Sequence, residues 1–227
     1  SDAGLHAIQT SGKATRNITA DPLSGLTEGE IEDARPYCEL IRRWFNLHPE
    51  FSWLPGKFKI AINGAKLDET ALRIHDLGLR LVRNGKGQLG FSVFVGGGLG
   101  AAAMIAAETA SFIQVEDILS YLESTMRIYN LKGRRDHQKK LRIKFLVREL
   151  GAEEFSRLVD EDWQQTRNDS KLKLNLVELE QLKKDFALPI RPIGLVGFKE
   201  KVDFNYSIWK KNNVRRHKVD GFSIVNI

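Results

Sequence analysis

Apolar residues recur at every second position in the first part of this chain and at every third or fourth position later, which predicts strands followed by helices. Leucines alternate over residues 77–81, Asn84-Gly85 supplies a tight turn, and residues 89–95 return as an apolar strand. Residues 54–63 and 7–10 are also typical of strands. Strands followed by helices place the chain in the mixed α/β class.

The helical segments carry apolar residues on one side. A first helix is predicted from about Asp33 to before Pro49, with Pro36 in its first turn. One later stripe joins Val115, Ile118, Leu119, Leu122, Met126 and Tyr129. Further helices are expected over residues 137–149, 152–164, 176–186 and 203–212, followed by a last strand at 222–227.

The composition favours a globular protein with anionic partners. Hydrophobic residues make up 42% of the 227 residues, and Lys plus Arg exceed Asp plus Glu by 35 to 29. This surplus is smaller than that of dedicated nucleic-acid binders. No run of about 18 apolar residues and no secretory signal is present, so we expect a cytoplasmic protein without membrane association.

The cysteine count limits the chemistry that the chain can carry. Cys38 is the only cysteine, which excludes an internal disulfide and a self-contained thiolate metal site. The histidines are scattered without ligand spacing, so no metal site is predicted at His6, His48, His75, His137 or His217. The chain opens without methionine and closes on an apolar alternation, from which we expect an internal segment of a longer protein.

Two short segments suit the recognition of an anion. Lys57 and Lys59 flank Phe58 on a strand, so both ammonium groups point to one face while Phe58 points to the core. Two neighbouring like charges favour a negative partner. Arg16 lies in the Gly/Thr/Asn-rich segment 10–19 and is suited to planar recognition of an oxyanion. The alternative is a strand-to-loop connection with a solvated arginine.

A glycine run, Gly96, Gly97 and Gly98, follows an apolar strand. Consecutive glycines let a backbone approach a flat ligand closely. The spacing is not that of a dinucleotide or phosphate loop, and a sharp strand exit explains the run equally well.

The third feature is a basic run with few acidic residues, made of Lys132, Arg134, Arg135, Lys139, Lys140, Arg142, Lys144 and Arg148. On a helix, Arg135, Lys139 and Arg142 share one face. The run is interpreted either as a solvated helix face or as a clamp for a ligand with several carboxylates or phosphates. Aromatic residues are not interleaved with it, which disfavours single-stranded nucleic acid.

The glycine run, the segment around Arg16 and the strand Leu54-Pro-Gly-Lys-Phe-Lys59 together resemble the sirohaem-dependent nitrite and sulfite reductases in order and approximate spacing. The resemblance covers nearly the whole chain, and the bacterial assimilatory sulfite reductase haemoprotein (beta) subunit is the most similar type. It implies six-electron reduction of sulfite to sulfide, or of nitrite to ammonia, at a sirohaem iron linked through a cysteine thiolate to a 4Fe-4S cluster.

The resemblance also implies roles for individual residues. Arg16, Lys57 and Lys59 are expected to contact the anion bound to iron, with Asn17 beside the cofactor. Lys59 favours sulfite, because family members dedicated to nitrite have an asparagine there. The macrocycle is expected against Gly96, Gly97 and Gly98, and its carboxylates are expected to meet Arg135, Lys139, Arg142 and Lys144.

The cysteine ligands of the cluster are expected outside this segment, so the segment alone is expected to be inactive. Ferredoxin or a flavoprotein reductase subunit is the expected electron donor. We expect a sirohaem-binding nitrite/sulfite reductase domain with a mixed sheet and packed helices over residues 1–165, a helical connector over 166–189 and the start of a second ferredoxin-like half-domain over 190–227. The alternatives are a nitrite reductase and a non-catalytic basic module that binds nucleic acid.

Overall fold

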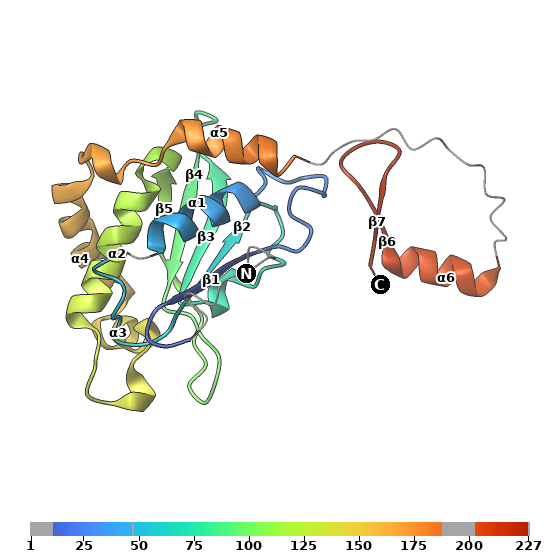
Figure 1. Ribbon diagram of the computed structural model, residues 1–227. Coiled ribbons are helices and arrows are strands. Elements are labelled where there is room, and N and C mark those ends of the chain that lie inside the picture. The colour runs from blue at the N-terminus through green and yellow to red at the C-terminus, as the bar shows by residue number, and fades with distance from the viewer. Residues whose placement is uncertain (1–10, 47, 188–202, 227) are drawn as a thin grey trace, which may run out of the picture.

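The computed structural model describes residues 11–46, 48–187 and 203–226. A five-stranded sheet in the order β1-β2-β3-β4-β5 forms its centre (Figure 1). The strands are β1 (Thr15–Ala20), β2 (Phe58–Asn63), β3 (Leu77–Arg83), β4 (Leu89–Val95) and β5 (Ala107–Gln114). The first three run parallel, and β4 is antiparallel to β3 and β5. This mixed sheet with packed helices confirms the predicted α/β class.

Five α-helices accompany the sheet: α1 (Arg35–Phe45), α2 (Ile118–Lys132), α3 (Ile143–Leu150), α4 (Ala152–Thr166) and α5 (Leu176–Asp185). Short 3-10 helices lie at Leu72–Ile74, Val115–Asp117, Gln138–Lys140 and Ser170–Leu172. A smaller unit follows, with α6 (Phe204–Asn213), β6 (Val214–Arg216) and β7 (Ser223–Val225). None of the helices in the described ranges combines the length and hydropathy that a membrane crossing requires.

The core lies between the sheet and the helices. Leu77, Leu79 and Leu81 of β3 have no exposed surface, as their alternation predicts. Tyr37 of α1 packs edge-on against Phe91 of β4, with ring centroids 5.4 Å apart. Each fully buried side chain of this size contributes about 1.5–3 kcal/mol, so these contacts stabilise the packing of the helices on the sheet.

The sequence predictions failed in two strands and in part of one helix. β1 was expected as a loop, but Ile18 packs on the core and β1 pairs with β2. β5 was not expected at all, because its apolar alternation is weak. The predicted helix 137–149 begins only at Ile143, since the preceding Arg142 has an extended backbone and its guanidinium binds Asp76. The expected strand at 7–10 lies outside the described residues.

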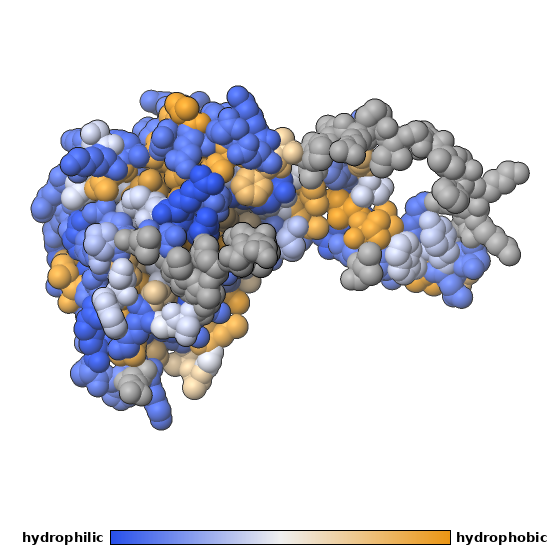
Figure 2. Space-filling model, viewed as in Figure 1, coloured by the Kyte–Doolittle hydropathy of each residue, from blue (hydrophilic) through white to orange (hydrophobic). Residues whose placement is uncertain are grey.

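The C-terminal unit leaves apolar side chains exposed, and Figure 2 shows apolar surface among polar residues there. α6 has no buried residue, and Trp209 is 43% exposed. The unit contacts the larger body through a hydrogen bond from the Lys218 N–H to the Leu26 carbonyl, 2.8 Å long. The expected last strand is confirmed as β7, paired with β6.

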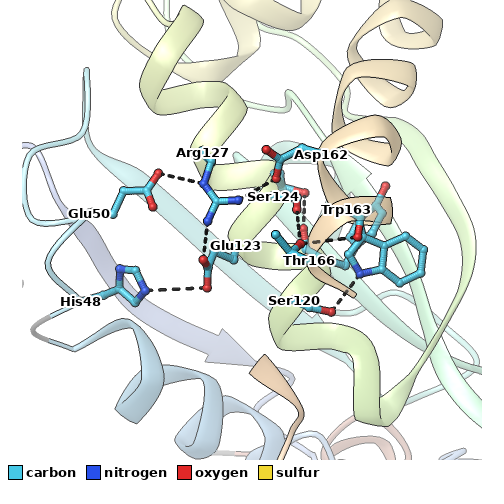
Figure 3. A network of polar contacts seen from close by, with 11 residues as sticks. His48, Glu50, Ser120, Glu123, Ser124, Arg127, Asp162, Trp163 and Thr166 are labelled. Carbon is cyan, nitrogen blue, oxygen red and sulfur yellow. Dashed lines mark hydrogen bonds and ion pairs between the residues drawn. The ribbon is translucent and has the colours of Figure 1, made fainter. Parts of the chain in front are cut away.

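One arginine on α2 joins three segments of the larger body (Figure 3). Arg127 forms ion pairs with Asp162 of α4 at 2.8 Å, with Glu50 after α1 at 3.4 Å and with Glu123 of its own helix. His48 lies 3.9 Å from Glu123. Burial raises the pKa of Glu123 and lowers that of His48. The arginine therefore keeps three carboxylates compatible with their partly buried positions.

Replacing Arg127 with methionine is expected to lower the free energy of unfolding by about 2 kcal/mol, because partly buried carboxylates lose their partner. Denaturant unfolding measures this. The matched control is Arg157→Met on α4, whose ion pairs with Glu154 and Glu161 are solvent-exposed and contribute little. Equal losses of unfolding free energy in the two variants would show that the Arg127 network stabilises the protein no more than an exposed ion pair does.

Candidate functional site

A cavity of about 740 Å³ lies beside the start of β1 and β2, and its charged lining is entirely cationic. The eight charged residues that line it are Lys13, Arg16, Lys57, Lys139, Lys140, Arg142, Lys144 and Arg148. His137 also lines it, and among the residues that the structure describes no aspartate or glutamate does. Apolar wall is supplied by Leu99, Ala101, Ala102, Leu141 and Phe145. The cavity is therefore suited to an anionic ligand with apolar surface.

Five of the sequence-predicted residues line this cavity, namely Arg16, Lys57, Lys139, Arg142 and Lys144. Segments more than a hundred residues apart in sequence thus meet at one place. The Arg16 guanidinium also donates to the Gly12 carbonyl at 3.0 Å. This bond holds the side chain against the loop that precedes β1.

Three other predicted residues do not line the cavity. Asn17 is exposed and does not line the cavity, although it directly follows Arg16 on β1. Lys59 is exposed and lies on β2, two residues after Lys57, which directly precedes the strand. Arg135 is exposed and donates to the backbone carbonyls of Trp53 and Asn130.

The three glycines after β4 are buried and fit against the protein itself. A side chain at Gly97 would begin 2.3 Å from the Arg73 carbonyl oxygen. One at Gly98 would meet the Arg142 guanidinium at 2.9 Å, and Gly96 has a φ of +95° beside Val147. The close approach predicted from the glycine run thus exists, but its partners are Arg73, Val147 and Arg142. The following residues, Leu99, Ala101 and Ala102, are the ones that line the cavity.

Lys144 forms hydrogen bonds with the loop that follows the three glycines. It is 4% exposed, and its Nζ donates to the carbonyls of Leu99 at 3.0 Å and Ala102 at 2.6 Å. Burial lowers the pKa of Lys144, and the neighbouring Arg142 lowers it further. Two of its three N–H groups are thus engaged in holding the cavity wall.

A fully buried carboxylate, Asp76, connects the lysine strand, the glycine run and the basic run. Its oxygens accept from Arg142 Nε and Nη2, both at 2.8 Å, and from the Lys59 N–H at 2.9 Å. Its backbone carbonyl accepts from the Gly96 N–H at 3.0 Å. Burial raises the pKa of Asp76, whereas Arg142 lowers it. The basic run, the lysine strand and the glycine run therefore meet at one carboxylate.

Tyr129 on α2 makes a second connection between these segments. Its hydroxyl donates to the Leu141 carbonyl at 2.9 Å and accepts from the Gly56 N–H at 3.0 Å. A side chain at Gly56 would lie 3.0 Å from Leu141, so the glycine allows the lysine strand to contact the basic segment. Burial raises the pKa of Tyr129, which keeps the hydroxyl protonated as a donor.

Sequence reasoning assigned no role in the site to Lys13, Asp76 or Tyr129, and it placed Tyr129 only on an apolar helix stripe. Lys13 lies just before β1, three residues from Arg16, and its charge was the available signal. Asp76 directly precedes the apolar alternation at Leu77, Leu79 and Leu81, so its charge beside core residues was a signal. Nothing in the spacing indicates its partners. Lys140 and Arg148 belong to the basic run that was interpreted as a solvated face or a ligand clamp, but they were not among the residues expected to meet the sirohaem carboxylates.

Metal ligands are not clustered in the described ranges, where no group of three or more His, Cys, Asp or Glu residues could hold a metal ion. Cys38 lies in α1, and burial raises the pKa of its thiol to about 12. A protonated, buried thiol is neither a metal ligand nor a nucleophile near neutral pH.

The model of the nitrite and sulphite reductase 4Fe-4S domain matches residues 11–167, which is more than half of the chain. The chain belongs to this family. Among similar members is sulfite reductase (ferredoxin) 1 of Mycolicibacterium paratuberculosis, which is 29% identical over 161 residues, covering 70% of this chain and 28% of that protein. The ferredoxin–nitrite reductase of Leptolyngbya laminosa is 30% identical over 164 residues, covering 70% of this chain and 32% of that protein.

Solved structures of nitrite and sulfite reductases resemble the fold. The Mycobacterium tuberculosis NirA protein matches with a TM-score of 0.67 and 27% identity, over 72% of this chain and 30% of that one. Dissimilatory sulfite reductase I has the same fold at a TM-score of 0.53 and 13% identity, over 90% of this chain and 62% of that one. This chain spans about a third of the length of the curated relatives.

The packing of the glycine loop in this family member predicts that Gly97→Ala lowers the free energy of unfolding of the ligand-free chain by about 3 kcal/mol, because the methyl group meets two backbone carbonyls. Gly85→Ala is the control. It has open space around it and should change stability by less than about 0.5 kcal/mol. If the ligand-free chain were as stable with Gly97→Ala, packing within the protein would not require a glycine at this position. The requirement would then have to come from a bound ligand.

Proposed function

We propose that this chain binds sirohaem and the substrate anion in a sulfite or nitrite reductase, and that the cavity is the site. The observation that carries the proposal is the charge of the cavity, whose eight charged lining residues are all Lys or Arg. Sulfite is the proposed substrate and nitrite the alternative, since relatives of both kinds match at similar identity.

The cavity fits the chemistry of sirohaem. This cofactor is a flat macrocycle with several carboxylates on its edge, and the lining combines cations with apolar side chains such as Leu99 and Phe145. The volume of about 740 Å³ lies within the usual range for cofactor sites. Cations gathered in a concave site repel one another, and a polycarboxylate relieves that repulsion. Lys139, Lys140, Arg142 and Arg148 are proposed to hold the carboxylates.

The 4Fe-4S cluster named by the family does not fit this chain by itself. Such clusters are held by four cysteine thiolates. The sequence has only Cys38, a half-buried residue of α1. No step of the reaction is therefore assigned to a cluster on these residues.

Arg16 and Lys57 are proposed to bind the substrate anion. Sirohaem, when bound, supplies the redox-active iron. The planar Arg16 guanidinium suits two oxygens of an oxyanion, and the Lys57 ammonium stabilises charge on an oxygen and can donate a proton to departing water. Lys59 lies on β2, two residues after Lys57, and is proposed to favour sulfite over nitrite.

The remaining parts of the proposal concern the whole protein. Ferredoxin is the proposed electron donor, because the names of the matching relatives specify it; a flavoprotein reductase subunit is the alternative. We propose that the protein is cytoplasmic. We also propose the division into a sirohaem-binding domain over residues 1–165, a helical connector over 166–189 and the start of a second half-domain over 190–227. The alternative function, binding of nucleic acid, is less compatible with a concave site that has one aromatic residue, Phe145, in its lining.

Sirohaem titration of the full chain tests the cavity, with the shift of the main absorption band as the readout. The double variant Lys140→Glu/Arg148→Glu should weaken binding at least about tenfold, because two attractive charges become repulsive. The matched control, Lys86→Glu/Lys184→Glu, makes the same charge change at exposed residues outside the cavity and should bind normally.

Absence of sirohaem binding by the unmodified chain would refute the proposal. Equal weakening by both double variants would show that net charge, and not the cavity, determines binding. Tight binding of DNA or RNA with a steep salt dependence would instead favour the nucleic-acid alternative.

Substrate preference is tested by replacing Lys59 with asparagine in the sirohaem-loaded chain. The ratio of nitrite to sulfite affinity, measured by difference absorption, should rise about tenfold, because the lost ammonium interacts more strongly with the more highly charged sulfite. Lys59→Arg keeps the charge and should leave the ratio nearly unchanged. An unchanged ratio in Lys59→Asn would remove Lys59 from the specificity argument.

A further inference from the structure

Behind the cationic cavity lies one carboxylate, Asp76, with no exposed surface. It does not line the cavity, but it contacts Arg142, which does. Four other carboxylates in the described ranges form bidentate arginine pairs, and they are 19% to 67% exposed and do not line this cavity: Asp33, Glu39, Asp136 and Glu154. Asp76 can therefore influence ligand binding in the cavity through its contact with Arg142.

The contacts define how Arg142 is held. The edge formed by Nε and Nη2 donates to both oxygens of Asp76 at 2.8 Å. Gly98 packs against the guanidinium and leaves no room for a side chain there. Nη1 takes no part in these two hydrogen bonds, and Arg142 contributes to the cavity lining. An arginine held on one edge presents its other edge in a fixed direction.

We propose that Asp76 is a positioning residue, which orients Arg142 so that the Nη1 edge binds a carboxylate of the tetrapyrrole. This inference rests on the proposed function of the cavity. The Lys59 N–H and the Gly96 N–H also donate to Asp76, to its side chain and its backbone carbonyl respectively. The same residue thus sets the position of the guanidinium relative to the lysine strand and the glycine loop.

Electrostatics alone predicts the opposite effect of removing this carboxylate. Asp76→Asn makes the site more positive by one charge, so a simple gain in attraction would tighten the binding of a polyanion. Loss of orientation would weaken it, because a guanidinium released from its partner must be ordered again when the ligand binds. The sign of the change in affinity therefore separates positioning from net charge.

The test uses the full chain and uroporphyrin, a metal-free tetrapyrrole carboxylate, with fluorescence quenching as the readout. Asp76→Asn and Arg142→Ala should each weaken binding about tenfold. The double variant should bind no more weakly than Arg142→Ala, because Asp76 acts only through the arginine. Glu39→Gln, which frees Arg42 away from the cavity, should bind like the unmodified chain.

Arg142→Lys gives a second measurement that does not require a change at the buried carboxylate. Lysine keeps the charge but cannot form the two parallel bonds, and it should also weaken binding about tenfold. Near-ultraviolet circular dichroism identifies variants that fold. If Asp76→Asn does not fold, Arg142→Lys decides, and normal affinity in that variant would overturn the positioning role.

Three results would overturn the inference, and they are distinguishable from failure of the proposed function. Equal or tighter binding by folded Asp76→Asn overturns positioning while leaving the cavity as the tetrapyrrole site. Additive losses in the double variant overturn it in the same way. Absence of binding by the unmodified chain overturns both.

Discussion

A buried carboxylate has to be paired, and the pairing of Asp76 determines where three distant parts of this chain meet. The side chain has no exposed surface, so an unpaired charge there would cost several kcal/mol. Arg142 and the backbone N–H of Lys59 satisfy its oxygens. The Gly96 N–H binds its carbonyl. The lysine strand, the basic segment and the glycine loop are thereby fixed around one point.

This arrangement leaves a cavity whose charge is not balanced within its own lining. Asp76 compensates Arg142 from behind, and Lys144 is engaged by two carbonyls of the loop. Cations such as Lys57 and Arg148 keep their charge directed at the cavity. A chain that gathers cations in this way is stabilised by an anionic ligand, and the family to which it belongs is consistent with a macrocycle that carries carboxylates.

The parts of the fold that the sequence predicts are those set by local pattern. The alternation at Leu77, Leu79 and Leu81 and the helix expected over residues 176–186 are examples. β1 was missed because its Thr, Arg and Asn residues are typical of a loop, and it becomes a strand by pairing with β2. These predictions succeed where neighbours along the chain decide the conformation.

The candidate site was only partly predictable, because its geometry depends on long-range contacts. Charge alone identified Arg16 and the basic run. The glycine run signalled close approach but not its partner, which is the protein's own backbone at Arg73. The pairing of Asp76 with Arg142 spans 66 residues and has no local signal, and it also explains why the predicted helix there begins late.

The most direct measurement is a crystal structure of this chain with sirohaem. The account predicts the macrocycle in the cationic cavity, with a carboxylate oxygen about 3 Å from Arg142 Nη1 while Nε and Nη2 remain on Asp76. A macrocycle bound elsewhere, or an Arg142 that leaves Asp76 to reach its ligand, would contradict it.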